Sequence, residues 1–394
     1  MKQQKAVRIN EAASTHLDMI RAVAALEVMA GHLRNLLFVR PESILHRSKW
    51  ITLGYALTTF SHQAVIVFFV LSGFFIASSV MGKIIDNSWS WRHYLIARLS
   101  RLYLVLIPSL LLCVFWDRLG MIVSHFSPDY TKSSPLLVGT GSVLDRTSVS
   151  VFLGNLFFLQ SARFPVFGSA TPLWSLSYEF WYYMMFPILL LIISVNTGQT
   201  YRVGYLALIA AIAWLVGPQI LLYLLIWLCG AAAAYILGWQ LRYKFTVSSR
   251  MMALSTVALL GALGLSRVCS MRSEIGADLI ASIAFATWIL ILAHASARPP
   301  SAIYAKYARG LAGFSYTLYL VHFPFILFLR TGLLHGHPWQ PSARHLMFGL
   351  LVSVAVIAYA YAVASITEAK TAAVRAFIVS RMAPDSKRRT ALVE

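Results

Sequence analysis

Long apolar stretches with almost no charge are the feature that most constrains how this chain can fold. Of its 394 residues, 59% are hydrophobic and 12% are charged, and the mean hydropathy is +0.70. Soluble globular domains contain about 45–50% apolar and about 25% charged residues. So few charges cannot cover a water-exposed surface, and the composition therefore argues against a soluble or a disordered protein.

The apolar stretches have the length of membrane-spanning helices, which need about 20 residues each. The predicted spans are residues 17–39, 62–81, 102–120, 174–195, 203–217, 219–238, 251–268, 277–295, 311–332 and 344–366. The sequence thus predicts an all-α integral membrane protein with about ten transmembrane helices. Gly217 and Pro218 are expected to form a tight hairpin between the fifth and sixth spans. Segments 50–60 and 149–160 are apolar but too short to cross, and we expect them at the membrane interface.

The distribution of positive charge predicts the orientation. The chain has 33 Lys and Arg residues against 14 Asp and Glu, a net charge of +19. With the N-terminus inside, about twice as many Lys and Arg residues fall in inner as in outer segments, and this bias is typical of cytoplasmic loops. Both termini are therefore predicted to be cytoplasmic, with a tail at 1–16, a membrane domain at 17–366 and a basic tail at 367–394. The charge is explained by topology and anionic lipid, so no nucleic-acid partner is expected.

Motifs for soluble cofactors are missing from the sequence. It contains no GxGxxG, P-loop or CxxC pattern, and its three cysteines, Cys113, Cys229 and Cys269, have no metal-like spacing. Each cysteine lies in or beside an apolar segment, where a small packed residue is expected. We therefore expect no bound cofactor, no metal site and no disulfide framework.

Ionisable residues within the spans are functional candidates, because each costs about 2.5–3.5 kcal/mol to insert. In the first span, Arg21 and His32 are eleven residues apart, which places them on one face of a helix and about 16 Å apart along its axis. The alternative is a snorkelling arginine, paired with Asp18, and a packed histidine. In the fourth span, Glu179 is expected within one turn of His32 in depth. A carboxylate there could orient the imidazole as a general base, or it could pair with another cation.

Two further groups lie in the third and ninth spans. Arg98 and Arg101 are one turn apart at the inner end of the third span, where guanidinium groups suit a phosphate ester; ordinary positive-inside signals are the alternative. Tyr316, Tyr319 and His322 recur at three-residue steps in the ninth span, either around a site or as core packing. The aromatic residues around Glu179 are expected to form a belt at the membrane interface.

Several of these segments together resemble acyltransferase family 3, integral membrane acyltransferases that modify cell-surface sugars. Arg21 and His32 are similar to the signature of its first span. FFVLSGFFI at 68–76 resembles its second-span motif, and ARLSRLYLVLIP at 97–108 resembles its Arg-x-x-Arg stretch. LWSLSYEFWYYMMFP at 173–187 is similar to its Trp-Ser-Leu-x-x-Glu segment. FSYTLYLVHFP at 314–324 resembles its late Tyr-x-x-Tyr-Leu-x-His-x-Pro segment. The family often ends its last span with Glu-Pro, whereas here Glu368 is followed by Ala369.

The resemblance implies transfer of an acyl group, usually acetyl, from cytoplasmic acyl-CoA to a hydroxyl of a lipid-linked or extracytoplasmic glycan such as lipopolysaccharide. It places catalysis on His32 and Glu179. It assigns donor and substrate binding to Arg21, Arg98, Arg101, Trp174, Ser175, Tyr316, Tyr319 and His322. The protein would lie in a bacterial inner membrane, with acyl-CoA and a glycan as its partners and an undefined oligomeric state. A transporter or glycan flippase is the alternative from another class, and a non-catalytic export scaffold is a third.

Overall fold

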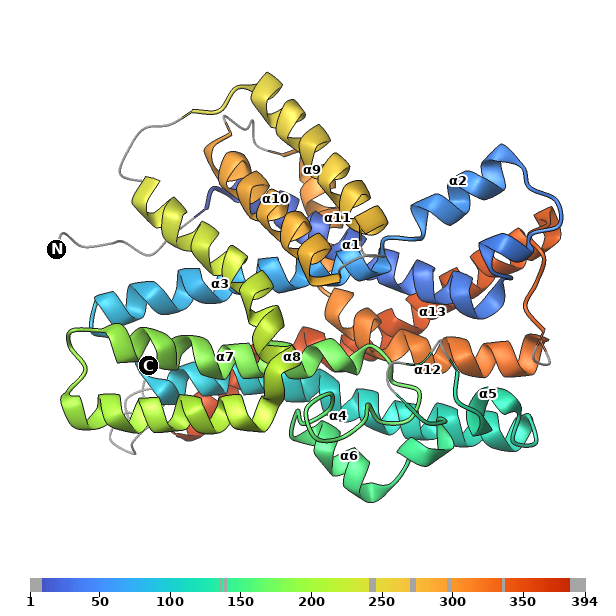
Figure 1. Ribbon diagram of the computed structural model, residues 1–394, viewed down its shortest axis with the longest axis horizontal. Helices are drawn as coiled ribbons and strands as arrows, with labels where there is room; N and C mark the ends of the chain where they lie inside the picture. Colours follow the sequence, from blue (N-terminus) through green and yellow to red (C-terminus); the bar gives the residue numbers. More distant parts are fainter. Residues whose placement is uncertain are drawn as a thin grey trace, which may run out of the picture.

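A computed structural model describes residues 9–134, 137, 140–240, 246–269, 274–295, 300–334 and 337–382. Within these ranges the chain folds into helices and contains no β-strand. The helices are α1 (Glu11–Leu37), η1 (Pro41–Ser43), α2 (Lys49–Leu57), α3 (Ser61–Ile85), α4 (Trp91–Val123), α5 (Pro128–Thr131), η2 (Leu144–Arg146), α6 (Val149–Leu156), α7 (Leu173–Ile193), α8 (Gln199–Gln240), α9 (Ser249–Cys269), α10 (Glu274–His294), α11 (Ala302–Ala312), α12 (Ser315–Leu334), α13 (Ala343–Ile366), η3 (Glu368–Lys370) and α14 (Thr371–Arg381). Figure 1 shows α3, α4, α7 and α12 running roughly along one long axis.

Among the described residues, seven helical segments are long and apolar enough to cross a membrane, or eight if the bent pair α11 and α12 counts as one span. The helical membrane-type fold agrees with the sequence, whereas the predicted count of ten stays a prediction. Two elements account for the difference. Helix α1 does not qualify because every 18-residue stretch of it contains at least three charged residues. Helix α8 holds two of the predicted spans and is counted once.

The break inside α8 lies at Gly217, whose φ of 79° and ψ of 174° are not helical. Residues with a side chain rarely adopt this positive φ, whereas glycine does so without strain. Pro218 follows and cannot donate a hydrogen bond back to the preceding turn. The chain changes direction here (Figure 1), so the predicted turn between the two segments is present.

The centre of the bundle is held by close approach of α3 and α8, the helix pair with the most extensive contact. A Cβ atom on Gly73 would lie 2.1 Å from the carbonyl oxygen of Trp227, and one on Gly230 would lie 1.9 Å from that of Val70. Small residues allow such backbone contact between membrane helices. The two backbones therefore touch, and this contact fixes the position of α3, which forms one wall of the pocket described below.

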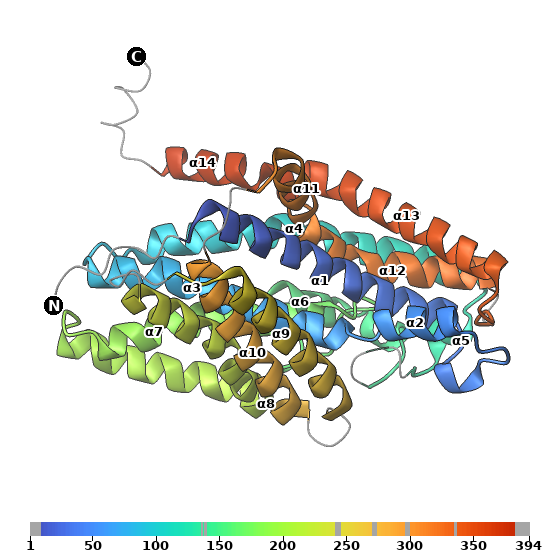
Figure 2. The same ribbon diagram turned by 90° about the horizontal axis from the view of Figure 1, so that it is seen from above.

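Helices α11 and α12 form a broken span with a 49° bend. As a result, α12 begins at Ser315, inside the protein. The segment expected as a basic tail contains α14, which packs against α4, and Arg92 donates a 2.5 Å hydrogen bond to the carbonyl oxygen of Met382. Residues 383–394 of the predicted tail lie outside the described residues. Figure 2 shows α14 and the first turns of α1 toward the same end of the molecule.

The loop before α7 is buried, not spread over the surface. Asp117 on α4 is fully buried and accepts hydrogen bonds from the backbone N–H of Ser169 at 2.9 Å and from its hydroxyl at 2.5 Å. Nearby, the backbone N–H and hydroxyl of Ser142 donate to Asp145 and hold the pKa of that exposed carboxyl below its usual value. Because the loop is buried, α7 begins inside the protein.

The predicted aromatic belt on α7 is not formed. Tyr178, Tyr182 and Tyr183 are 1%, 0% and 7% exposed and belong to the core. The hydroxyl of Tyr182 donates to the carbonyl oxygen of Ile220 at 2.7 Å. The sequence interpretation was wrong because it placed the start of α7 at the membrane surface, whereas the preceding loop covers it.

Candidate active site

A pocket of about 100 Å³ opens between α1, α3, α4, α7 and α12. Its lining includes seven of the ten predicted site residues. They are Arg21, Arg98, Arg101, Ser175, Glu179, Tyr316 and Tyr319. Trp174, His32 and His322 do not line it. Trp174 packs instead against Phe69 and Tyr178 in the neighbouring core.

Three guanidinium groups line this pocket, which we call the cationic pocket. Arg21 is 3.1 Å from Asp18, so the predicted pairing of these two residues is confirmed. It also lies 5.3 Å from the ring centre of Phe75. Arg98 lies over the ring of Tyr183 at 5.9 Å, and its buried Nε has no hydrogen-bond partner within the described residues. Cations in an apolar wall attract a polyanion more strongly than surface cations do.

Two carboxylates face these cations. Glu179 interacts electrostatically with Arg101, and Glu368 interacts with both Arg101 and Arg21. One oxygen of Glu368 also accepts hydrogen bonds from the backbone N–H of Thr317 at 2.9 Å and from its hydroxyl at 2.8 Å. Glu368 therefore caps the first turn of α12. The missing proline after it does not remove this residue from the site.

Glu179 is held by two neutral hydroxyls. It accepts a short hydrogen bond from Tyr183, one turn further along α7, and a 3.1 Å bond from Ser72 on α3. The indole N–H of Trp227 donates to the Ser72 hydroxyl at 3.2 Å. The carboxylate is thereby fixed on the wall of the cationic pocket.

His32 pairs with His322. The Nδ1 atom of His32 is 2.8 Å from the Nε2 atom of His322, and the two rings stack with centres 5.1 Å apart. The Nδ1 atom of His322 is 2.8 Å from the carbonyl oxygen of Leu318. Since a carbonyl only accepts, His322 carries its proton on Nδ1 and leaves Nε2 as an acceptor. His32 then donates from Nδ1, and its own Nε2 keeps a free lone pair.

The predicted contact between His32 and Glu179 is not formed in the described part of the chain. Glu179 is one turn from Ser175 along α7, Ser175 is bonded to Tyr319, and Tyr319 is one turn from His322 along α12. Seven residues of helical rise, about 10 Å, therefore separate their depths. The prediction of equal depth was wrong because α7 begins inside the protein and not at its surface.

The sequence matches the model of one known protein family. The model of a family described as "Acyltransferase domain" matches residues 15–362, nearly the whole chain. The chain belongs to acyltransferase family 3. An uncharacterized protein of Haemophilus influenzae is 28% identical over 130 residues, which are 32% of this chain and 48% of that protein. No solved structure matches the chain.

Membership in this acyltransferase family gives the pocket and the histidine pair a chemical context.

Sequence reasoning missed Ser72 and Tyr183 as partners of Glu179. Ser72 lies within the motif at 68–76, and Tyr183 is one helical turn from Glu179, so both signals were available. Two further charged residues of α1 bind backbone groups at the α2–α3 connection: Glu27 accepts from the backbone N–H of Phe60 at 2.9 Å, and Arg34 donates to the carbonyl oxygen of Tyr55.

Proposed function

We propose that the protein is a membrane O-acyltransferase that moves an acyl group, acetyl in the first instance, from acyl-CoA to a hydroxyl of a lipid-linked or extracytoplasmic glycan. The observation that carries this proposal is the histidine pair, in which His32 presents a free Nε2 lone pair. An oriented imidazole of this kind is the base that acyl transfer to a hydroxyl requires.

The cationic pocket supports acyl-CoA as the donor. Arg21, Arg98 and Arg101 line the pocket, and Arg98 forms no ion pair within the described residues. The phosphates of CoA bind guanidinium groups in a fork geometry that lysine does not reproduce. The unpartnered hydroxyl of Tyr316 and Nε of Arg98 offer two more donors to such a ligand.

The reaction follows from the histidine pair. Nε2 of His32 takes the proton of the acceptor hydroxyl as its oxygen attacks the thioester carbonyl carbon. The C–O bond forms, the C–S bond breaks, and the CoA thiolate leaves and takes up the proton. His322 has the role that a carboxylate has in a serine-protease triad, because it orients the ring of His32 and accepts a hydrogen bond from its Nδ1–H. Transient transfer of the acyl group to Nε2 of His32 is the alternative path for the same groups.

The proposed location is a bacterial inner membrane, with both termini in the cytoplasm. Positive charge in the loops supports this orientation. It places Arg21 toward the cytoplasm, where acyl-CoA is made, and His32 toward the outer face, where glycans are assembled.

The test is an assay of the purified protein in lipid nanodiscs with radiolabelled acetyl-CoA. We expect release of free thiol and transfer of label to a lipid-linked glycan fraction. Mass spectrometry of surface glycans from a deletion strain identifies the acceptor. Movement of an unmodified glycan across vesicle membranes, without loss of acetyl-CoA, would instead identify a transporter.

A further inference from the structure

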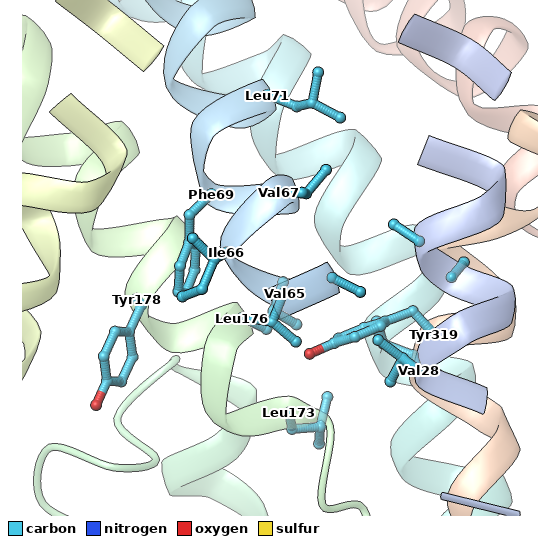
Figure 3. Packing of buried hydrophobic residues seen from close by; sticks show 14 of the residues in the cluster. Val28, Val65, Ile66, Val67, Phe69, Leu71, Leu173, Leu176, Tyr178 and Tyr319 are labelled. Atoms are coloured by element: carbon cyan, nitrogen blue, oxygen red, sulfur yellow. The ribbon is translucent and has the colours of Figure 1, made fainter. Parts of the chain in front are cut away.

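The side chain of Tyr319 lies between the cationic pocket and the histidine pair. Along α12, Tyr316 and Tyr319 line the pocket, whereas His322, one turn further on, does not. The Tyr319 and His322 ring centres are 6.5 Å apart. Figure 3 shows the ring of Tyr319 reaching across the core from α12, near Val28, toward Leu176 on α7 and Val65 on α3.

We propose that the hydrogen bond between Tyr319 and Ser175 is a closed gate between the donor pocket and His32. The hydroxyls of Tyr319 and Ser175 are 2.7 Å apart, and the side chains are 7% and 6% exposed. The Ser175 hydroxyl also donates to the carbonyl oxygen of Pro172 at 3.3 Å. Since Ser175 has one proton, Tyr319 is the donor in their mutual bond.

The hydrogen bond between Tyr319 and Ser175 can break when a ligand binds. If the Tyr319 side chain turns away, Ser175 keeps Pro172 as its acceptor, and only the Tyr319 hydroxyl proton needs a new acceptor, which an entering ligand can supply. A net hydrogen bond of this kind is weak enough to be broken on binding of a ligand. Phe68 packs edge-on against Tyr319, with ring centres 5.6 Å apart, and completes the barrier in the closed state.

The role of the gate rests on the proposed function, whereas the existence of the gate can be tested without it. Arg21 and His32 are about 16 Å apart along α1, so a thioester held by the arginines must pass Tyr319 to reach Nε2 of His32. A permanently open passage would let water reach the thioester. It would also leave a polar path through the membrane domain. Closure by Tyr319 confines the donor until it occupies the passage.

The first experiment measures access without any need for catalysis. A cysteine is placed beyond the gate by His32→Cys, with Cys229 and Cys269 replaced by Ala, and sealed vesicles receive a charged methanethiosulfonate reagent on the pocket side. We expect Tyr319→Ala to speed labelling by about tenfold or more, and Ser175→Ala, which retains the ring, by about fivefold. Tyr178→Phe, on α7 but outside the pocket, is the matched control and should leave the rate unchanged.

The second experiment retains His32 and measures acyl-CoA hydrolysis without an acceptor. Tyr319→Phe and Ser175→Ala should raise hydrolysis relative to transfer by similar factors, and the double variant should equal either single one. Equal labelling rates with and without Ser175→Ala and Tyr319→Ala, in proteins that elute as single species, would overturn the gate. If labelling responds but no variant turns over acyl-CoA, the proposed function fails while the gate stands.

Discussion

The Nδ1 atom of His32 lies 2.8 Å from the Nε2 atom of His322, on a different helix. Because the Nδ1–H of His322 donates a hydrogen bond to the carbonyl oxygen of Leu318, Nε2 of His322 is the acceptor for the Nδ1–H of His32, and Nε2 of His32 keeps its lone pair. The orientation of the His32 ring and its tautomer thus depend on a residue 290 positions away in the sequence.

Removal of either histidine should separate their roles. His32→Ala should lower acyl transfer by about 10²–10⁴-fold, the usual contribution of a positioned general base. His322→Phe keeps the ring but loses the acceptor, so we expect a smaller loss and a changed pH profile. His16→Gln is the control, since His16 pairs with Tyr304 at 2.9 Å, away from the site. Normal transfer by His32→Ala at equal expression would end the catalytic assignment.

Glu179 should act with its hydroxyl partner and not with the histidines. Tyr183→Phe removes, and Glu179→Gln weakens, the same short hydrogen bond, so their effects on apparent donor affinity should be strongly non-additive. Glu179→Gln and His322→Phe should instead combine nearly additively, because about 10 Å separates them in depth. Steady-state kinetics of the four single and double variants measures both couplings. Strong coupling between Glu179 and His322 would instead indicate that Glu179 and the histidines act together as one catalytic unit.

The arginines should determine donor binding. Arg98→Ala and Arg101→Ala should each raise the apparent KM for acyl-CoA about ten- to hundredfold, the range for hydrogen bonds to charged groups. Arg→Lys variants at the same positions should recover part of the lost affinity for acyl-CoA, because lysine keeps the charge but not the fork geometry. Arg118→Ala, on the same helix but outside the pocket, is the control. Unchanged KM values in both variants would reduce these arginines to topology signals.

The glycine contact predicts a matched pair of stability variants. Gly73→Ala should lower the yield and thermal stability of the folded protein, because its Cβ atom would lie 2.1 Å from a backbone oxygen. Overpacking of this kind costs about 1–3 kcal/mol. Gly261→Ala on α9 meets no atom within 4 Å and should be neutral or slightly stabilising. Thermal unfolding followed by fluorescence-detected size-exclusion chromatography compares the two, and equal melting temperatures would contradict the packing argument.

Topology can be measured with single cysteines. With both termini inside, a membrane-impermeant maleimide added to intact cells should label Lys132→Cys and His337→Cys but not Arg250→Cys. All three positions are exposed, so access to the reagent depends on the side of the membrane alone. Labelling of Arg250→Cys from outside would invert the orientation.

Local sequence patterns predicted the helices and seven of the residues that line the pocket, because apolar runs and charges inside them are properties of neighbouring positions. Depth was harder to predict. Counting residues from the edge of a span assumes that the span starts at the membrane surface, and α7 does not, because the loop bonded to Asp117 covers its start. The same assumption misplaced Tyr182 and Tyr183 in an interface belt. The pairing of His32 with His322 depends on how α1 and α12 pack, which no local pattern contains.

The contact between Gly73 and α8 has a consequence for redesign of the donor pocket. Gly73 directly follows Ser72, a wall residue, so the backbone at that wall has no freedom to retreat from a bulkier ligand. The facing wall, with Tyr316 and Leu320, stands on α12, which follows a bend. Enlarging the pocket for longer acyl chains should therefore succeed through smaller side chains at Leu320 on α12 and fail through changes on α3.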